Sequence, residues 1–270
     1  MNNGFHACKM NYELIFVSET DSTNSYLKRM ETDDNGKPTV VWTDFQTAGR
    51  GCGTNIWESE PGKNLTFSIM LRPRNIAARD QFILSMAHAV ALQRTLSLYI
   101  DNVRVKWPND IYWNDRKLCG TLIETSLGAQ HIKTCIIGTG INVNQRVFCS
   151  DAPNPVSLWQ ILHRELNREE VLRQVVEQTI ALAQLAEDGQ AEAIRREYDA
   201  ALYRKNELHA YRLPSGERRE YILAGVSDDG HLLLMPPGSR EIDAYAFKEI
   251  QFLIDECPPD NHESYTTIPK

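Results

Sequence analysis

The sequence is organised around one stretch, VRVKWPNDIYWNDRKLCGTLIE, residues 103–124. Its apolar runs have the length and composition of short β-strands, and they cover residues 103–105, 111–113 and 118–123. The turn from Lys106 to Asp110 separates the first two runs, and Pro108 within it excludes a continuing helix. One cation, one amide and one carboxylate are thereby fixed between two strands. This placement predicts a charged site at a sheet edge, where it would meet an anionic substrate.

The turn by itself is also compatible with a solvated lysine in front of a common Pro-Asn-Asp turn. The longer string KWPNDIYWNDRKLCGTLIE, residues 106–124, is far more specific, and it resembles the signature of the biotin protein ligases. Three further segments resemble motifs of that family in the family's order, namely DSTN at 21–24, QTAGRG at 46–51 and GTGIN at 138–142. The resemblance extends over about residues 12–254.

These segments also have a local physical meaning. Asp21 and Ser22 precede a predicted helix that ends near Met30, and side-chain oxygens at such a start cap free amides, worth about 1 kcal/mol. The same amides and hydroxyls would bind a polar ligand head. Three glycines within 49–53 permit close approach to a ligand, and Arg50 between two of them is a cation suited to phosphate or carboxylate. The loop lacks GK[ST] and is therefore no Walker A motif.

The predicted fold class is α+β. The resemblance implies a mixed-sheet catalytic domain of the biotin/lipoate ligase type over residues 12–203, followed by a small C-terminal SH3-like β domain over 204–256. The residues agree with this division, because helical patterns such as 168–187 give way after Arg204 to short alternating runs separated by turns. The polar, proline-containing residues 257–270 are expected to form a disordered tail.

The family implies an ATP-dependent ligase that works in two steps. The carboxylate of biotin attacks the α-phosphorus of ATP and gives biotinoyl-5′-AMP and pyrophosphate. A lysine of a biotin carboxyl carrier domain then attacks the acyl carbon and releases AMP. Alternatives are a lipoate or octanoate ligase of the same fold and a non-catalytic biotin-binding or sensing protein. KWPND together with GRG favours biotin, and the presence of Lys106 favours catalysis.

The resemblance implies a catalytic role for three residues. Lys106 is expected to be the main cation near the biotin carboxylate and the α-phosphate, because the two reactants meet only when charge is neutralised and they are aligned. Arg50 is expected to hold phosphate or adenylate oxygens. Asp110 either accepts the proton of the attacking lysine or orients Lys106, and the sequence leaves both readings open.

The resemblance also implies a binding site for biotin and the nucleotide. Its expected members are Ser22, Thr23, Asn24, Gln46, Gly49, Gly51, Trp57, Lys106, Trp107, Asn109, Lys117, Gly120, Gly140 and Asn142. Ser22, Thr23 and Gln46 would bind the biotin ring system by hydrogen bonds, and Gly120 would let the ring lie close. Lys117 would assist with the phosphates, and Asn142 would meet the ribose or adenine. No metal ligands are assigned to the chain, since Mg²⁺ is expected to be carried by ATP.

The glycine-rich loop departs from the family pattern at one informative place. The family reads GRGR, whereas this chain reads GRGC with Cys52 at the second arginine, and Gly53 and the residues after it depart as well. A thiol is a weak donor without charge. The loop is therefore expected to hold an adenylate less tightly unless another cation compensates, and Lys63 is the nearest in the sequence.

Composition limits the remaining possibilities. With 270 residues and a net charge of −7, the chain is not expected to bind nucleic acid as a sequence-specific repressor, which needs a basic face. About eleven residues precede the first strand, too few for a helix-turn-helix domain. No signal peptide or membrane span is predicted. The six scattered cysteines indicate reduced thiols and a cytoplasmic location, and a homodimer is left open.

Overall fold

Two β-sheets of unequal size build the protein. They belong to a computed structural model that describes residues 11–30, 36–53, 55–128, 131–149 and 154–254. The large sheet has seven strands in the order β1-β2-β3-β7-β6-β5-β4, and only β1 and β2 pair in parallel. Its strands are β1 (Glu13–Thr20), β2 (Thr39–Gln46), β3 (Leu65–Leu71), β4 (Val103–Lys106), β5 (Asp110–Trp113), β6 (Arg116–Leu127) and β7 (Ile132–Ile141). The predicted mixed sheet is confirmed.

Strands β6 and β7 are longer than their apolar runs indicate. The apolar runs cover residues 118–123 and 132–137, but the two strands pair from Cys119↔Ile141 to Leu127↔Ile132. Extension into GTGI is possible because Gly138 and Gly140 offer no side chain that would obstruct the layer above the sheet. Residues 138–141, GTGI, are therefore part of β7.

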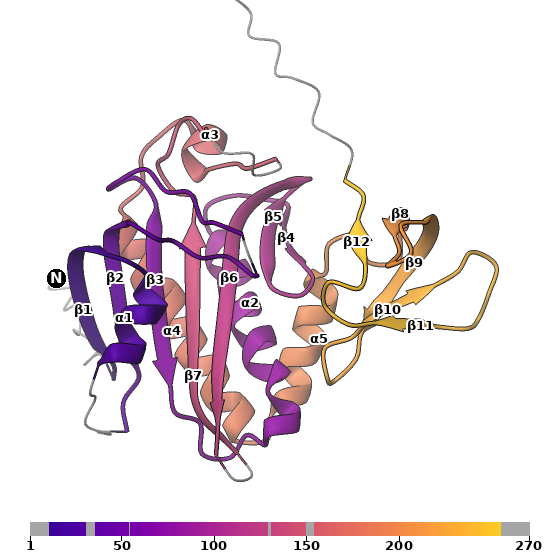
Figure 1. The fold of residues 1–270 in the computed structure, drawn as a ribbon, viewed down its shortest axis with the longest axis horizontal. Coiled ribbons are helices and arrows are strands. Elements are labelled where there is room, and N and C mark those ends of the chain that lie inside the picture. Colours follow the sequence, from indigo (N-terminus) through magenta and orange to yellow (C-terminus); the bar gives the residue numbers. More distant parts are fainter. Residues whose placement is uncertain (1–10, 31–35, 54, 129–130, 150–153, 255–270) are drawn as a thin grey trace, which may run out of the picture.

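Helices cover the two faces of the large sheet unequally (Figure 1). The short helix α1 (Thr23–Arg29) lies on one face, whereas α2 (Phe82–Leu96), α4 (Arg168–Glu187) and α5 (Ala191–Ala201) lie on the other. Twelve of the fifteen residues of α2 are buried, since the sheet and its helical neighbours enclose it. The short elements η1 (Ala78–Asp80) and α3 (Leu158–Leu162) complete this unit. Among the described residues, no helix combines the length and apolar character needed to cross a bilayer.

The second sheet is small and wholly antiparallel. Its strands are β8 (Leu208–Arg212), β9 (Arg218–Val226), β10 (Leu232–Met235), β11 (Asp243–Tyr245) and β12 (Gln251–Phe252), in the order β11-β10-β9-β8-β12. We call it the C-terminal sheet. The predicted small β unit is confirmed, while the domain boundaries stay a prediction. The expected disordered tail, 257–270, lies outside the described residues.

The turn between β4 and β5 joins the two units. The indole Nε1 of Trp107 donates to the backbone oxygen of Gly230 at 2.9 Å, and its ring packs edge-on against Phe247 with centroids 5.9 Å apart. From the other side, the hydroxyl of Tyr198 donates to the oxygen of Pro108 at 2.7 Å. The turn that carries Lys106 and Asp110 is thus fixed by α5 and by the C-terminal sheet together.

A buried polar chain crosses the core between α4 and β7. The hydroxyl of Thr179 donates to the oxygen of Val175 at 2.8 Å, so His88 Nδ1, 3.0 Å away, must donate to Thr179. His88 Nε2 then accepts from the hydroxyl of Thr139 at 2.8 Å. Burial lowers the pKa of His88 to about 3, so the imidazole is neutral at physiological pH. His88 is therefore a packed residue of the core, bound on both sides by threonine hydroxyls.

His88 predicts a loss of stability in mild acid. In the unfolded chain its pKa returns to about 6.5, so the unfolded state binds a proton below that pH while the folded state does not. The free energy of unfolding should fall by about 2 kcal/mol between pH 6.5 and 5 on this account. Guanidinium unfolding of the wild type and of His88→Gln at both pH values measures this loss of stability. The difference between the two proteins isolates His88, because they share every other titrating group. An equal pH dependence in the two proteins would contradict the argument.

Candidate functional site

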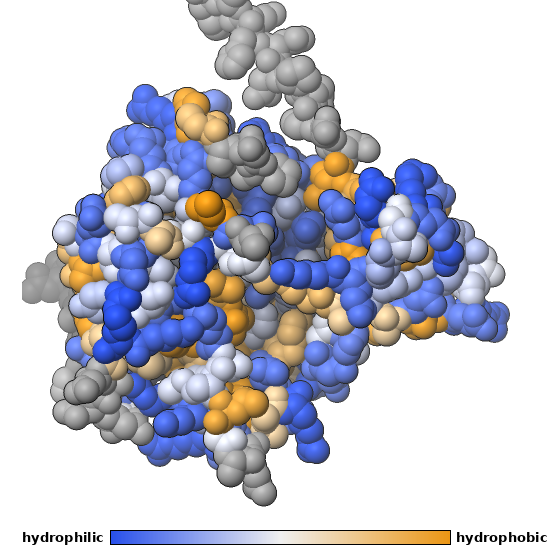
Figure 2. All heavy atoms as spheres, viewed as in Figure 1, coloured by the Kyte–Doolittle hydropathy of each residue, from blue (hydrophilic) through white to orange (hydrophobic). Residues whose placement is uncertain are grey.

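One cavity of about 540 Å³ gathers most of the predicted site residues. It lies between the start of α1, the loop after β2, the β4–β5 turn and strands β6 and β7, and its volume falls in the range of small-molecule sites, roughly 300–1,000 Å³. Of the predicted residues, all but Gly49 and Asn142 line it. Figure 2 shows this side of the molecule as largely hydrophilic, with apolar residues in small separate patches.

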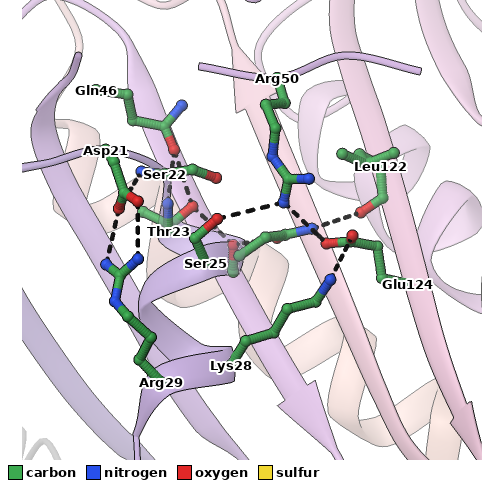
Figure 3. Close-up of polar contacts among 12 residues, drawn as sticks. Asp21, Ser22, Thr23, Ser25, Lys28, Arg29, Gln46, Arg50, Leu122 and Glu124 are labelled. Atoms are coloured by element: carbon green, nitrogen blue, oxygen red, sulfur yellow. Dashed lines mark hydrogen bonds and ion pairs between the residues drawn. The ribbon is translucent and has the colours of Figure 1, made fainter. Parts of the chain in front are cut away.

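The start of α1 is held from outside the helix. Ser22 occupies the N-cap position, but its side chain makes no capping bond. Instead Gln46 Oε1, from β2, accepts from the amide of Thr23 at 2.8 Å and from its hydroxyl at 3.1 Å. Asp21 accepts from the Ser22 amide and pairs with Arg29 at 2.7 Å (Figure 3). The expected capping by Ser22 is therefore wrong, and its hydroxyl lines the cavity without a bond to the helix.

Asn24 ties α1 to the sheet. Its Oδ1 accepts from Ser68 of β3 at 2.6 Å, and its Nδ2 donates to Leu122 O at 3.3 Å and to Glu124 Oε2 at 2.8 Å. The amide lies directly on Gly138, where a Cβ would come within 2.2 Å of Oδ1. Asn24 is only 2% exposed, and most of the hydrogen bonds that its side chain can make are used in this attachment.

Glu124 is the common partner of α1 and the glycine-rich loop (Figure 3). Its carboxylate accepts from Lys28 at 2.5 Å and from Arg50 at 3.3 Å, in addition to Asn24. Burial acts to raise the pKa of Glu124, but the hydrogen bonds from Lys28 and Asn24 outweigh it, so the pKa lies below its ordinary value. Arg50 also donates to Ser25 Oγ at 3.4 Å. The loop is thereby attached to both β6 and α1.

The loop returns on itself and places Trp57 on the sheet. The amide of Gly51 donates to Asn55 O at 2.7 Å, and the amide of Trp57 to Gly49 O at 3.0 Å. Trp57 covers the two glycines that pair across β6 and β7: a Cβ at Gly140 would lie 2.1 Å from its ring, and one at Gly120 would lie 3.0 Å away. The space above Gly120, expected for the biotin ring, is thus occupied by Trp57.

Two lysines reach the cavity in different ways. Lys117 Nζ donates to Asp110 Oδ2 at 2.7 Å, with both side chains partly exposed. Lys106 Nζ instead lies over the rings of Tyr112 and Phe252, 5.3 and 4.8 Å from their centroids. Burial lowers the pKa of Lys106, and the nearby Asp110 opposes this shift. The cation that faces Asp110 is therefore Lys117 rather than Lys106.

Three other predicted residues are tied into the framework. Asn142 is buried; its amide donates to Val156 O at 3.1 Å, and it does not line the cavity. Gly49 belongs to the loop turn, where a Cβ would meet Trp57 O at 2.7 Å. Asn109 lines the cavity and donates to Ser85 Oγ at 3.2 Å.

Sequence reasoning missed several residues around the cavity. Ser68, Glu124 and Phe247 were given no role, although Ser68 and Glu124 hold α1 and Phe247 lines the wall. The alternation of β6 contained one usable signal, because Gly120, Leu122 and Glu124 must share a face of that strand. Nothing in the local sequence pointed to Phe247, which comes from the C-terminal sheet.

The described residues contain no group of three or more His, Cys, Asp or Glu side chains that could hold a metal ion. The carboxylate that lines the cavity, Asp110, already pairs with Lys117.

The chain is similar in sequence to known proteins. Residues 16–142 match the model of the "Biotin/lipoate A/B protein ligase family". The "Bifunctional ligase/repressor BirA" of Bacillus spizizenii is 31% identical over 173 residues, which are 62% of this chain and 52% of that protein. The "Biotin--[acetyl-CoA-carboxylase] ligase" of Paracoccus denitrificans is 28% identical over 84% of this chain and 95% of its own. The chain thus spans about half the length of the BirA relative.

The fold has a solved counterpart. The structure of "Biotin protein ligase from Aquifex aeolicus in complex with biotin and ATP" superposes with a TM-score of 0.74 over 90% of this chain and 99% of that one, at 24% identity. Both the mixed sheet and the small C-terminal sheet are consistent with that architecture. In the matched segment, in its relatives and in its fold, the chain is similar to the biotin protein ligases.

Proposed function

We propose that the protein activates biotin with ATP as biotinoyl-5′-AMP and transfers the biotinoyl group to a lysine of a biotin carboxyl carrier domain. The observation that carries the proposal is the single cavity that brings the start of α1, the glycine-rich loop and the Lys117–Asp110 pair together. The cavity offers hydroxyl groups at the start of α1 and fixed cations at the loop and at Lys117. Biotin, an uncharged ring system with a carboxylate tail, requires both kinds of group. MgATP enters as the second substrate.

Lys117 is proposed as the main cation of the first step. In that step an oxygen of the biotin carboxylate bonds to the α-phosphorus and pyrophosphate leaves, so negative charge gathers where the two anions meet. Lys117 lies at the cavity with its ammonium held by Asp110, whereas Lys106 is turned toward aromatic rings. A preorganised cation stabilises the transition state because it needs no reorientation during the reaction.

Asp110 is proposed to orient Lys117. In the second step the amine of the carrier lysine bonds to the acyl carbon, AMP leaves with the bonding electrons, and the amine gives up a proton. The carboxylate of Asp110, which lies 2.7 Å from Lys117 Nζ, is also proposed to accept that proton. The two roles need not conflict, since one oxygen can hold the lysine while the other accepts the proton.

Arg50 is proposed to hold adenylate oxygens after exchanging partners. It is bound to Glu124 and Ser25, and its side chain is 44% exposed. A phosphate that enters the cavity would compete with Glu124 for the guanidinium, and Glu124 would keep Lys28 as its partner. The acceptor, the cytoplasmic location and the carriage of Mg²⁺ by ATP likewise belong to the proposal. The cysteines of the described residues are unpaired, which supports a reducing compartment.

Biotin-dependent exchange of pyrophosphate into ATP tests the function and the choice of cation. Wild type should show exchange with biotin but not with lipoate. Lys117→Ala should lower the rate by about 10²–10³, as expected when one fixed charge is lost at a phosphoryl centre. Lys106→Met keeps the aliphatic stem between the two rings and should lower the rate by less than roughly tenfold.

Unchanged circular dichroism and melting serve as the control for folding in both variants. Loss of exchange in Lys106→Met with little effect in Lys117→Ala would restore Lys106 as the main cation. No exchange in the wild-type protein would refute the proposed function itself.

Glu124→Gln should loosen the glycine-rich loop. An exposed ion pair is worth about 0.2–1 kcal/mol, so trypsin cleavage after Arg50 should accelerate by up to roughly fivefold. Asp21→Asn is the matched control, because it removes the ion pair with Arg29 on α1 and leaves the loop untouched. Mass spectrometry of the peptide that begins at Gly51 gives the rate. Equal cleavage in Glu124→Gln and wild type would show that other contacts hold the loop.

A further inference from the structure

The cations that line the cavity are already engaged within the chain. In the described residues these are Arg50, Lys106 and Lys117. Arg50 pairs with Glu124, Lys117 pairs with Asp110, and Lys106 lies over aromatic rings. The loop itself has Cys52 where the family pattern has an arginine. Lys63, the nearest other cation in the sequence, pairs with Glu165 at 3.4 Å.

A fourth cation approaches from the C-terminal sheet. Lys248 lies on the connection from β11 to β12, which runs along the side of the small sheet that faces the large one (Figure 1). Its Nζ comes so near the glycine-rich loop that a Cβ built on Gly53 would lie only 2.4 Å from it. Gly53 is the residue after Cys52. The ammonium of Lys248 therefore lies beside the position where the loop lacks its charge.

The backbone around Lys248 is fixed and unfavourable for a lysine. Its φ is 73°, in the left-handed region that favours glycine. The amide of Ala246 donates to the carboxylate of Glu249 at 2.7 Å, and the amide of Glu249 donates back to Ala246 O at 3.0 Å, so the turn is closed around Lys248. Phe247, the preceding residue, lines the cavity and packs on Trp107.

Lys248 keeps its charge available. Across the part of the chain that the structure describes, no carboxylate pairs with its ammonium and no hydrogen bond engages it. The side chain is exposed and lies just outside the cavity, between Phe247, which lines it, and Gly53, which follows the lining residue Cys52. A lysine ammonium on its flexible four-carbon stem can reach a phosphate and offer up to three donors. Such a cation is free to bind an incoming anion without first giving up a partner.

We propose that Lys248 is a phosphate-binding residue of the active site and supplies, from the C-terminal sheet, the positive charge that Cys52 removes from the loop. Its ligand is the phosphate of ATP and of the acyl-adenylate, so the inference rests on the proposed function. Gly53 is part of the same arrangement, because a side chain there would meet the lysine head.

Two readouts test the proposal, namely ATP affinity by calorimetry and the rate of biotinoyl-AMP release by stopped flow. Lys248→Gly removes the charge and suits the left-handed backbone. It should weaken ATP binding and speed adenylate release by roughly tenfold each, while its melting temperature stays equal or rises. A merely structural lysine would not show better stability together with weaker binding. The effect should shrink at high salt, since the ammonium is exposed.

Charge rescue separates electrostatics from shape. Lys248→Arg should bind ATP as wild type does. Adding Cys52→Arg to Lys248→Gly should bring adenylate release back to within roughly threefold of wild type, because a charge returns to the loop. Lys133→Ala removes an exposed lysine on β7, away from the cavity, and should change neither readout.

The outcomes distinguish this proposal from the function on which it rests. Binding and release in Lys248→Gly equal to wild type, or a defect that neither arginine restores, would overturn the role of Lys248 while the ligase function stands. If Lys248→Gly loses only the modification of the carrier, with ATP affinity and adenylate release unchanged, the proposed role of Lys248 is overturned as well. If the wild-type protein binds ATP but shows no biotin-dependent exchange, the ligase function is overturned. In that case the comparison of ATP affinities by calorimetry still shows whether Lys248 binds phosphate. No ATP binding by wild type would overturn both.

Discussion

The cavity depends on a bare strip of backbone on one face of the large sheet. Gly120, Gly138 and Gly140 share that face of β6 and β7. Asn24 and Trp57 lie against it at distances that a Cβ on Gly138 or Gly140 would not tolerate, and a Cβ on Gly120 would also be tight. Because the side chains of Asn24 and Trp57 pack directly on the backbone, α1 and the glycine-rich loop lie close to the sheet. Asn24 and Arg50 then reach the same carboxylate, Glu124, and their mutual position is fixed. A methyl group on this strip would raise the layer that forms the site, so the strip sets its geometry.

The positive charges around the cavity are balanced in the absence of substrate. Arg50 and Lys117 each have a carboxylate partner, and the half-buried Lys106 lies over two rings with a lowered pKa. Uncompensated cations held close together would repel one another and strain the fold. The carboxylate partners within the chain reduce that repulsion. A substrate phosphate must then compete with these carboxylates for Arg50 and Lys117. Lys248 has no such competitor among the described residues, and this difference sets it apart from the other three.

Much of the fold and part of the site could be predicted from the sequence. Strand 65–71 and helix 168–187 have strong local patterns, and they appear at those residues. The segments around Ser22, Arg50 and Lys117 were expected to meet, and they do line one cavity. The direction of the Lys106 side chain could not be predicted, because spacing in a hairpin does not say toward which neighbour a long side chain turns. Its aromatic partner Phe252 lies far along the chain, as Lys248 does from Gly53. Contacts of that kind depend on how the two units pack, which no local motif encodes.

The position of Trp57 has an optical consequence. Its indole lies on Gly120 and Gly140 and forms a wall of the cavity. Its buried Nε1 has no hydrogen-bond partner among the described residues. Any molecule that enters there changes the polarity and the hydrogen bonding around a fluorophore that belongs to the chain. The other four tryptophans give a background, so replacing Trp57 alone isolates its emission. The protein therefore carries an intrinsic reporter of occupancy, and filling of the site can be followed by light without a label.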